Sequence, residues 1–347
     1  MPELKNSKYR SGSIGSLVYK LINSVLYFTP ILLSNLKFRK SLLLPLYNKK
    51  EDGKNVCKEK TIVYMVQKET TFSGGLSDRL RGIVGIYAEC KKQDLPFKLV
   101  FEPLHLQDYL EPNQYNWIIG EDEIAWNTKD VYPCTLLTYH ADTNNRYQHF
   151  VQNTILKSYL RKPYKQIHVY SNMICKDEEY GPLFNELFKP SVDLQNQLDY
   201  HLSQIGGRGT YISCTFRFRQ LLGDFKEGGD VLPEQEREAY ILRAIHTVEK
   251  LHGENPTNRI LVTADSGTFL NRVKELDYVY VIPGEVVHVG FTFDANKQTY
   301  MKSFVDMYML SYASTVYLVR DELMYHSGFP YRAALLNSVE YKEINLS

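Results

Sequence analysis

The sequence predicts an α/β protein of two domains. Its 347 residues are enough for two domains of ordinary size. Hydrophobic residues make up 44% and charged residues 23%, which is a globular balance. From about residue 210 onward, β-rich segments alternate with segments of helical spacing. This alternation is typical of a parallel sheet covered by helices on both faces.

The N-terminal half begins with a strand, a glycine turn, a helix and a second strand. The strands are expected at Thr61 to Val66 and at Phe97 to Glu102. Between them, Gly74 and Gly75 precede apolar residues spaced for a helix from Leu76 to Lys92. Residues 103–200 are rich in aromatic side chains and are expected to hold several helices whose order the sequence leaves open.

The C-terminal half shows four further strand and helix pairs. The expected strands are Thr210 to Phe218, Arg259 to Ser266, Tyr278 to Pro283 and Thr315 to Arg320. The expected helices are Pro233 to Leu251, Thr268 to Lys274, Ser303 to Tyr312 and Ser327 to Leu336. We expect an N-terminal segment over 1–58, a first α/β domain over 59–205 and a second α/β domain over 206–347. Ligands of such sheets bind beyond the carboxyl ends of the strands.

Charge and cysteine usage narrow the function classes. The net charge is +1, so no overall field attracts nucleic acid, and an anion must be bound by a local site. The five cysteines are odd in number and form no CxxC, which argues against a disulfide framework and a structural zinc site. No D-x-D or HExxH motif is present, so we expect no metal. A reducing, cytoplasmic setting fits best.

Residues 16–38 form an apolar run interrupted by Lys20, Asn23 and Pro30. A spanning helix needs about 20 uninterrupted apolar residues, so this run is a poor candidate for one. Basic residues flank it on both sides. One interpretation is an amphipathic helix that contacts an anionic membrane through residues 16–40. The other is a helix that packs on the body of the protein.

The segment Ser73 to Gly82 is the first candidate site. Gly74 and Gly75 allow backbone N–H groups to approach an anion, and the following helix N-terminus adds positive potential. Arg79 and Arg81 add charge. The alternative is an ordinary tight turn before a capped helix.

The segment Thr215 to Asp224, at the end of a predicted strand, is the second candidate. Arg217 and Arg219 alternate with apolar residues, so both are expected on one face. A buried arginine needs an anionic partner, and a guanidinium matches diphosphate oxygens in a bidentate manner. The alternative is a structural salt bridge, for example with Asp224.

Two strand-to-helix turns complete the set. Asp265 and Ser266 follow one strand and could bond a base or ribose. Ser327 and Gly328 open the last helix and could bind an anion. Helix capping is the alternative in both cases.

These four segments, in this order, resemble the fucosyltransferase superfamily of GT-B architecture, which includes α-1,2-, α-1,6- and protein O-fucosyltransferases. The family's glycine turn, G-x-G-N-R/Q-L, corresponds here to Gly74-Gly75-Leu76-Ser77-Asp78-Arg79-Leu80. Its H-x-R-R-x-D strand end corresponds to Thr215-Phe216-Arg217, with Asp224 further along. Its later motifs correspond to Thr263-Ala264-Asp265-Ser266 and Ser327-Gly328-Phe329. Thr215 replaces the family histidine, and Asp78 replaces the asparagine.

The resemblance implies two Rossmann-like domains that face each other across a cleft. The N-terminal domain, 59–205, would be on the acceptor side, and the C-terminal domain, 206–347, would bind the nucleotide sugar. The resemblance also implies an inverting, metal-independent transfer of fucose from GDP-fucose to a glycan acceptor, in polysaccharide or glycoconjugate synthesis, with no cofactor beyond the donor. Arg217 would stabilise the leaving diphosphate. Asp78, Glu102, His105 and Asp108 are the candidate bases from the first domain. The substrate would be bound by Gly74, Gly75, Arg79, Arg219, Asp224, Asp265, Ser266, Ser327, Gly328 and Phe329. The alternatives are a transferase for another nucleotide sugar, or a non-catalytic nucleotide- or sugar-binding module.

Overall fold

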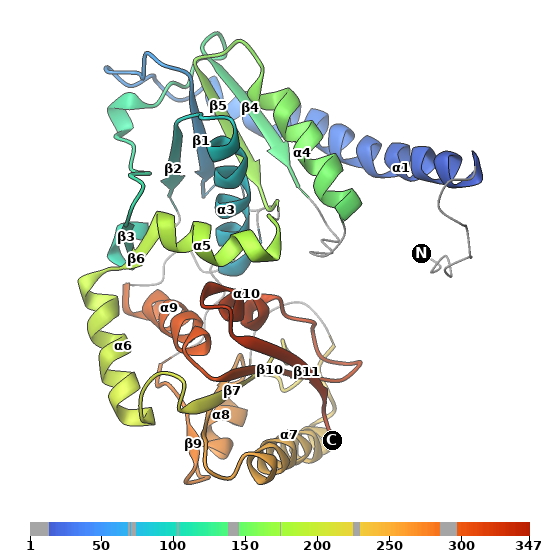
Figure 1. The fold of residues 1–347 in the computed structure, drawn as a ribbon, viewed down its shortest axis with the longest axis vertical. Coiled ribbons are helices and arrows are strands. Elements are labelled where there is room, and N and C mark those ends of the chain that lie inside the picture. Colours follow the sequence, from blue (N-terminus) through green and yellow to red (C-terminus); the bar gives the residue numbers. More distant parts are fainter. Residues whose placement is uncertain are drawn as a thin grey trace.

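A computed structural model describes residues 14–68, 70, 74–102, 104–137, 146–173, 175–224, 230–284 and 297–347. The chain builds two parallel sheets, one above the other in Figure 1, each with helices against it. The upper sheet has four strands in the order β2-β1-β5-β4, and the lower has five in the order β11-β10-β7-β8-β9. The predicted α/β class with parallel sheets is confirmed.

The upper sheet is made of strands that are mostly buried, because helices and the N-terminal segment cover it. Its strands are β1 (Thr61–Val66), β2 (Phe97–Phe101), β4 (Val131–Leu136) and β5 (Gln166–Ser171). Its helices are α3 (Leu76–Lys92) and α4 (Arg146–Leu160). The predicted strand at 61–66 and helix at 76–92 are confirmed. Sequence reading missed β4 and β5, and β5 lies in the middle of the sheet.

The N-terminal segment is helical over the predicted range and attaches to this sheet. It comprises α1 (Ile14–Phe38), a π-helical turn η1 (Arg39–Leu43) and α2 (Leu44–Tyr47). Ile31 of α1 is buried, and Leu43 and Tyr47 pack into a core with residues of β1, β4 and β5. No helix among the described residues is long and apolar enough to cross a membrane.

Further short elements and two helices also precede the lower sheet in the chain. They are η3 (Leu106–Asp108), β3 (Leu110–Pro112), η4 (Glu121–Glu123), α5 (Asp177–Leu187), β6 (Phe188–Pro190) and α6 (Val192–Ile205). β3 and β6 pair antiparallel. The helices predicted within 103–200 are therefore present, together with the two unpredicted strands of the upper sheet.

The lower sheet follows the predicted alternation. Its strands are β7 (Tyr211–Phe216), β8 (Arg259–Ala264), β9 (Val279–Tyr280), β10 (Thr315–Arg320) and β11 (Glu340–Asn345). Its helices are α7 (Glu234–Glu254), α8 (Gly267–Val273), α9 (Lys297–Ser311) and α10 (Phe329–Leu336). The predicted strand 210–218 was too long, because β7 ends at Phe216 and a turn begins at Arg219. β11 was missed because it is a charged, mostly exposed edge strand.

The two halves meet through α5 and α10, which lie next to each other in Figure 1. Gly181 of α5 lies so close to α10 that an added Cβ would overlap the carbonyl oxygen of Leu335. Asn185 donates a hydrogen bond to the Leu336 carbonyl (3.0 Å), and Arg332 forms an ion pair with Asp177 (3.3 Å). The largest apolar core includes residues from both sheets. The proposed domain boundaries at 58/59 and 205/206 stay predictions.

Candidate functional site

Arg217 and Asp265 lie directly beyond two paired strand ends. Phe216 at the end of β7 is in register with Ala264 at the end of β8. The next residue of each strand carries a charge, and Nη1 of Arg217 lies 2.9 Å from Oδ2 of Asp265. Only 4% of Asp265 is exposed. This ion pair therefore sits where open α/β sheets bind their ligands.

Asp265 also organises the backbone that follows β7. Its two carboxylate oxygens accept hydrogen bonds from the backbone N–H groups of Phe218 (2.8 Å) and Arg219 (2.7 Å). Arg219 has a left-handed backbone, with φ of 54°. Burial raises the pKa of Asp265 to about 6, and the positive charge of Arg217 opposes that rise. One buried carboxylate thus fixes the loop that presents both arginines.

Two expectations about these arginines can be compared with the structure. β7 ends at Phe216, so the strand alternation that was to place Arg217 and Arg219 on one face does not extend to them. The alternative of a structural salt bridge for Arg217 is present, with Asp265 as a partner. The partner depends on the strand register, which the local sequence does not contain.

Tyr325 is a site residue that sequence reasoning missed. Its backbone N–H donates to the Arg217 carbonyl (3.1 Å), and its ring centroid lies 5.3 Å from the guanidinium carbon of Arg219. The loop after β10 is thereby joined to the loop after β7. No local signal marks Tyr325, because the contact connects segments about a hundred residues apart.

Asp224 and Ser266 are joined by a hydrogen bond. The Ser266 hydroxyl donates to Oδ2 of Asp224 (2.7 Å), which also accepts the backbone N–H of Thr268 (2.8 Å). Ser266 caps α8 by accepting the N–H of Phe269 (3.1 Å). The capping alternative is therefore confirmed for Ser266. Asp224 thereby belongs to the same loop cluster as Ser266.

The turn before α10 has the predicted form. Gly328 is the N-cap, the helix begins at Phe329, and the Ser327 hydroxyl accepts the N–H of Phe329 (3.3 Å). Ser327 is buried. Further into the helix, Arg332 is buried and paired with Asp177. This turn begins two residues after Tyr325 and so adjoins the loop that contains Arg217.

The glycine turn lies on the other half of the molecule. Gly74 has φ of 75°, and an added Cβ would overlap the Asp78 carboxylate, so the position requires glycine. Gly75 is the N-cap of α3. Asp78 pairs with Arg81 (2.8 Å) and its side chain is 44% exposed. The candidate base is therefore accessible but ion-paired.

Arg79 is fully buried at the start of α3. Its Nε donates to the Gly74 carbonyl (2.9 Å), and its guanidinium carbon lies 5.8 Å from the ring centroid of Phe101. Among the described residues, Nη1 and Nη2 have no hydrogen-bond partner. Burial lowers the pKa of Arg79, although the phenols of Tyr64 and Tyr300 oppose that effect. A buried guanidinium with unsatisfied nitrogens beside a helix N-terminus suits an anion.

The structure thus forms two groups of predicted residues. Arg217, Arg219, Asp224, Asp265, Ser266 and the Ser327 turn are on the lower half, and Gly74, Gly75, Asp78 and Arg79 are on the upper half. The groups approach each other at Arg81 and Arg332: burial lowers the pKa of Arg81, and the positive charge of Arg332 lowers it further.

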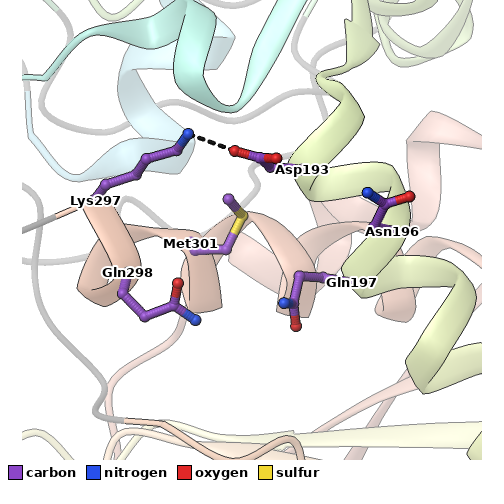
Figure 2. Close-up of a pocket in the computed structure, with 6 residues that line it drawn as sticks. All are labelled: Asp193, Asn196, Gln197, Lys297, Gln298 and Met301. Atoms are coloured by element: carbon purple, nitrogen blue, oxygen red, sulfur yellow. Dashed lines mark hydrogen bonds and ion pairs between the residues drawn. The ribbon is translucent and has the colours of Figure 1, made fainter.

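Two further observations concern other kinds of site. A hollow of about 470 Å³ lies between α6 and α9, where Lys297 and Asp193 form an ion pair of 2.6 Å (Figure 2). None of its lining residues was singled out in the sequence. Over the part of the chain that the structure describes, no three His, Cys, Asp or Glu side chains gather as a metal site would require.

Comparison with solved structures identifies the fold of the chain. No protein-family model and no curated protein matches the chain. Among solved structures, the α-1,6-fucosyltransferase NodZ soaked with GDP-fucose matches 80% of this chain and 93% of its own, with a TM-score of 0.51 and 13% identity. NodZ from Bradyrhizobium also matches with a TM-score of 0.51 and 13% identity, over 81% of this chain and 93% of its own. A variant of Arabidopsis thaliana FUT1 in complex with GDP matches 98% of this chain and 81% of its own, with a TM-score of 0.51 and 14% identity.

The chain has the fold of these fucosyltransferases. The GT-B-like class and the resemblance drawn from the four motifs are confirmed at the level of fold. In this fucosyltransferase-like fold, the Arg217 and Asp265 pair lies at the carboxyl ends of strands β7 and β8.

Proposed function

We propose that the protein is a glycosyltransferase that uses GDP-fucose as donor and a glycan as acceptor. The observation that carries this proposal is the Arg217 guanidinium, held by Asp265 at the paired ends of β7 and β8. The fold supports it, because NodZ was soaked with GDP-fucose and the Arabidopsis FUT1 variant holds GDP. An arginine whose side chain is already oriented by a carboxylate can bind a diphosphate without changing its conformation.

The lower half would hold the donor. Arg217 would bind the diphosphate, and Arg219 and the turn from Ser327 to Phe329 would border it. Asp265 acts as a positioning residue, because its oxygens are occupied by Arg217 and by two backbone N–H groups. Ser266 and Asp224 would shape the side of the site that receives the nucleoside.

The upper half would provide a second contact for an anion. The two unsatisfied terminal nitrogens of Arg79 need an acceptor, and a phosphate oxygen would satisfy them. Burial lowers the pKa of Arg79, and the phenols of Tyr64 and of Tyr300 on α9 oppose this, so Arg79 is within electrostatic range of the other half of the molecule. A donor bound by both Arg217 and Arg79 would join the two halves.

The proposed chemistry is a displacement with inversion at the anomeric carbon. A bond forms from the acceptor oxygen to that carbon, while the bond from the carbon to the phosphate oxygen breaks and GDP leaves with the electron pair. Arg217 would stabilise the charge that develops on GDP, which is the task a metal performs elsewhere, so we propose a metal-independent reaction. The acceptor proton would pass to Asp78, an accessible carboxylate.

A non-catalytic nucleotide- or sugar-binding module is the second candidate, and two observations favour it. Asp78 is paired with Arg81 rather than placed alone. Thr215, which stands where the family has histidine, is hydrogen-bonded to Thr263 on the neighbouring strand (2.8 Å). A module of this kind would bind the nucleotide and leave the donor intact.

Calorimetric titration with GDP tests the donor site. Arg217→Ala should weaken GDP binding by about 10- to 100-fold, the value of a charge-assisted contact. Arg272→Ala is the matched control, because Arg272 is an exposed, ion-paired arginine of the same half (2.9 Å from Glu238). Equal affinity in the parent and Arg217→Ala would refute the role of Arg217. Incubation with GDP-fucose and mixed glycans then separates the candidates, since only the enzyme releases GDP.

A further inference from the structure

Helix α1 carries a stripe of exposed apolar side chains, which we call the α1 stripe. Its members are Val18, Leu21, Ile22, Val25, Leu32, Leu33 and Leu36. At 100° per residue, these positions fall within an arc of about 120° on one side of the helix. Soluble proteins rarely expose so long an apolar face to solvent, so the α1 stripe indicates an interaction site.

The protein's own body does not cover the stripe. The opposite side of α1 makes the internal contacts: Ile31 and Asn35 are buried, and the Asn35 side chain accepts the backbone N–H of Thr135 (2.7 Å). In Figure 1 the N-terminal part of α1 extends away from both sheets. The two interpretations of this segment are therefore compatible, because one side packs on the body and the other is open.

The charge of this segment identifies the chemistry of the partner. Residues 4–50 contain nine Lys and Arg and no Asp or Glu. The net charge of the whole chain is +1, so the remaining residues carry an excess of eight acids. Lys37 and Lys40, near the end of the stripe, are both exposed. An apolar stripe in a purely basic segment matches a surface that is apolar inside and anionic outside.

We propose that α1 lies in the interface of a lipid bilayer that contains anionic lipids, with the α1 stripe buried among the acyl chains and the lysines at the headgroups. No described helix could cross a membrane, which fits a helix lying in the plane of the interface. A second copy of this chain is a weaker occupant, because pairing two stripes would bring two acid-free basic segments together. This site is independent of the proposed nucleotide site.

Vesicle flotation of the full chain tests the proposal. The parent should float with vesicles of equimolar phosphatidylcholine and phosphatidylserine, and much less with phosphatidylcholine alone. Val25→Glu should lower the bound fraction at least about tenfold, because it places a charge in the stripe. Val192→Glu is the matched control: both valines are exposed, at 57% and 69%, but Val192 lies on α6. The control should float like the parent.

The double variant Lys37→Glu, Lys40→Glu tests the electrostatic part. It should lose about tenfold or more in binding to the anionic vesicles, since each lysine near such a surface contributes to attraction. All variants should keep the parent's GDP affinity and circular dichroism. Three results would overturn the proposal: binding that Val25→Glu leaves unchanged, equal loss in Val192→Glu, or a parent that forms dimers dissociated by Val25→Glu and does not float.

Discussion

A substitution of Arg79 can distinguish a role in ligand binding from a role in stability. Its guanidinium is buried, and two of its nitrogens lack a partner in the part of the chain that the structure describes. Replacing it by methionine removes the charge and keeps an unbranched side chain of comparable reach. A buried charged residue with a good partner normally costs about 3–5 kcal/mol when that pairing is broken. For Arg79 the expected change is different.

The magnitude follows from the contacts. Arg79→Met loses the hydrogen bond from Nε to the Gly74 carbonyl and the contact with the Phe101 ring, together about 2–4 kcal/mol. It also removes two buried unsatisfied nitrogens, each of which costs about 1–3 kcal/mol. We therefore expect the free energy of unfolding to stay within about 2 kcal/mol of the parent value and not to fall by more.

Urea unfolding followed by circular dichroism measures this, with GDP titration alongside. Arg332→Met is the matched control, because Arg332 is a buried arginine that has a partner in Asp177 (3.3 Å). The control should lose about 3–5 kcal/mol, whereas Arg79→Met should keep its stability and lose about tenfold or more in GDP affinity. If Arg79→Met loses as much stability as Arg332→Met, or keeps full GDP affinity, the reasoning is wrong.

Three further predictions concern stability. Asp265→Ala should lower the free energy of unfolding by about 3–5 kcal/mol in urea titrations, because three donors lose their acceptor; a loss under about 1 kcal/mol would contradict this. Gly181→Ala should cost about 1–3 kcal/mol, because its Cβ would overlap α10, whereas Gly253→Ala on open α7 should not destabilise. Burial lowers the pKa of His168 to about 3, below its value of about 6.5 in the unfolded chain. Its contribution to the free energy of unfolding is therefore complete above about pH 6.5, and about 2 kcal/mol of it is lost by about pH 5. Urea denaturation at both pH values should show this loss in the free energy of unfolding of the parent and of His246→Gln, a variant of an exposed histidine. The loss should be much smaller in His168→Gln.

The elements that the sequence predicted well are apolar runs between clear turns. The strand at 61–66, the helix at 76–92 and the strand at 315–320 have the observed bounds. β5 was missed because Gln166, His168 and Ser171 interrupt its apolar pattern. Those polar groups are bonded to partners elsewhere, as when His168 lies 2.6 Å from the Tyr47 hydroxyl and 2.9 Å from Gln166. Only the tertiary structure supplies such partners.

The sequence predicted which segments form the site, but it did not predict which of their side chains contact one another. Strand ends followed by arginine and aspartate could be found by pattern. The pairing of Arg217 with Asp265 depends on the register of β7 and β8, and the contact of Tyr325 depends on a loop packed across the sheet edge. The unsatisfied state of Arg79 depends on its burial, which the sequence does not state.

The central claim is that a guanosine diphosphate group binds beside Arg217. Thermal unfolding of the parent and of Arg217→Ala, each with GDP, UDP, CMP, ADP and dTDP, tests it most directly. A ligand at about 100 times its dissociation constant adds about 2.7 kcal/mol to stability. The account predicts that GDP alone raises the melting temperature of the parent and does not raise that of Arg217→Ala. No response to any nucleotide, or an equal GDP response in both proteins, would contradict it.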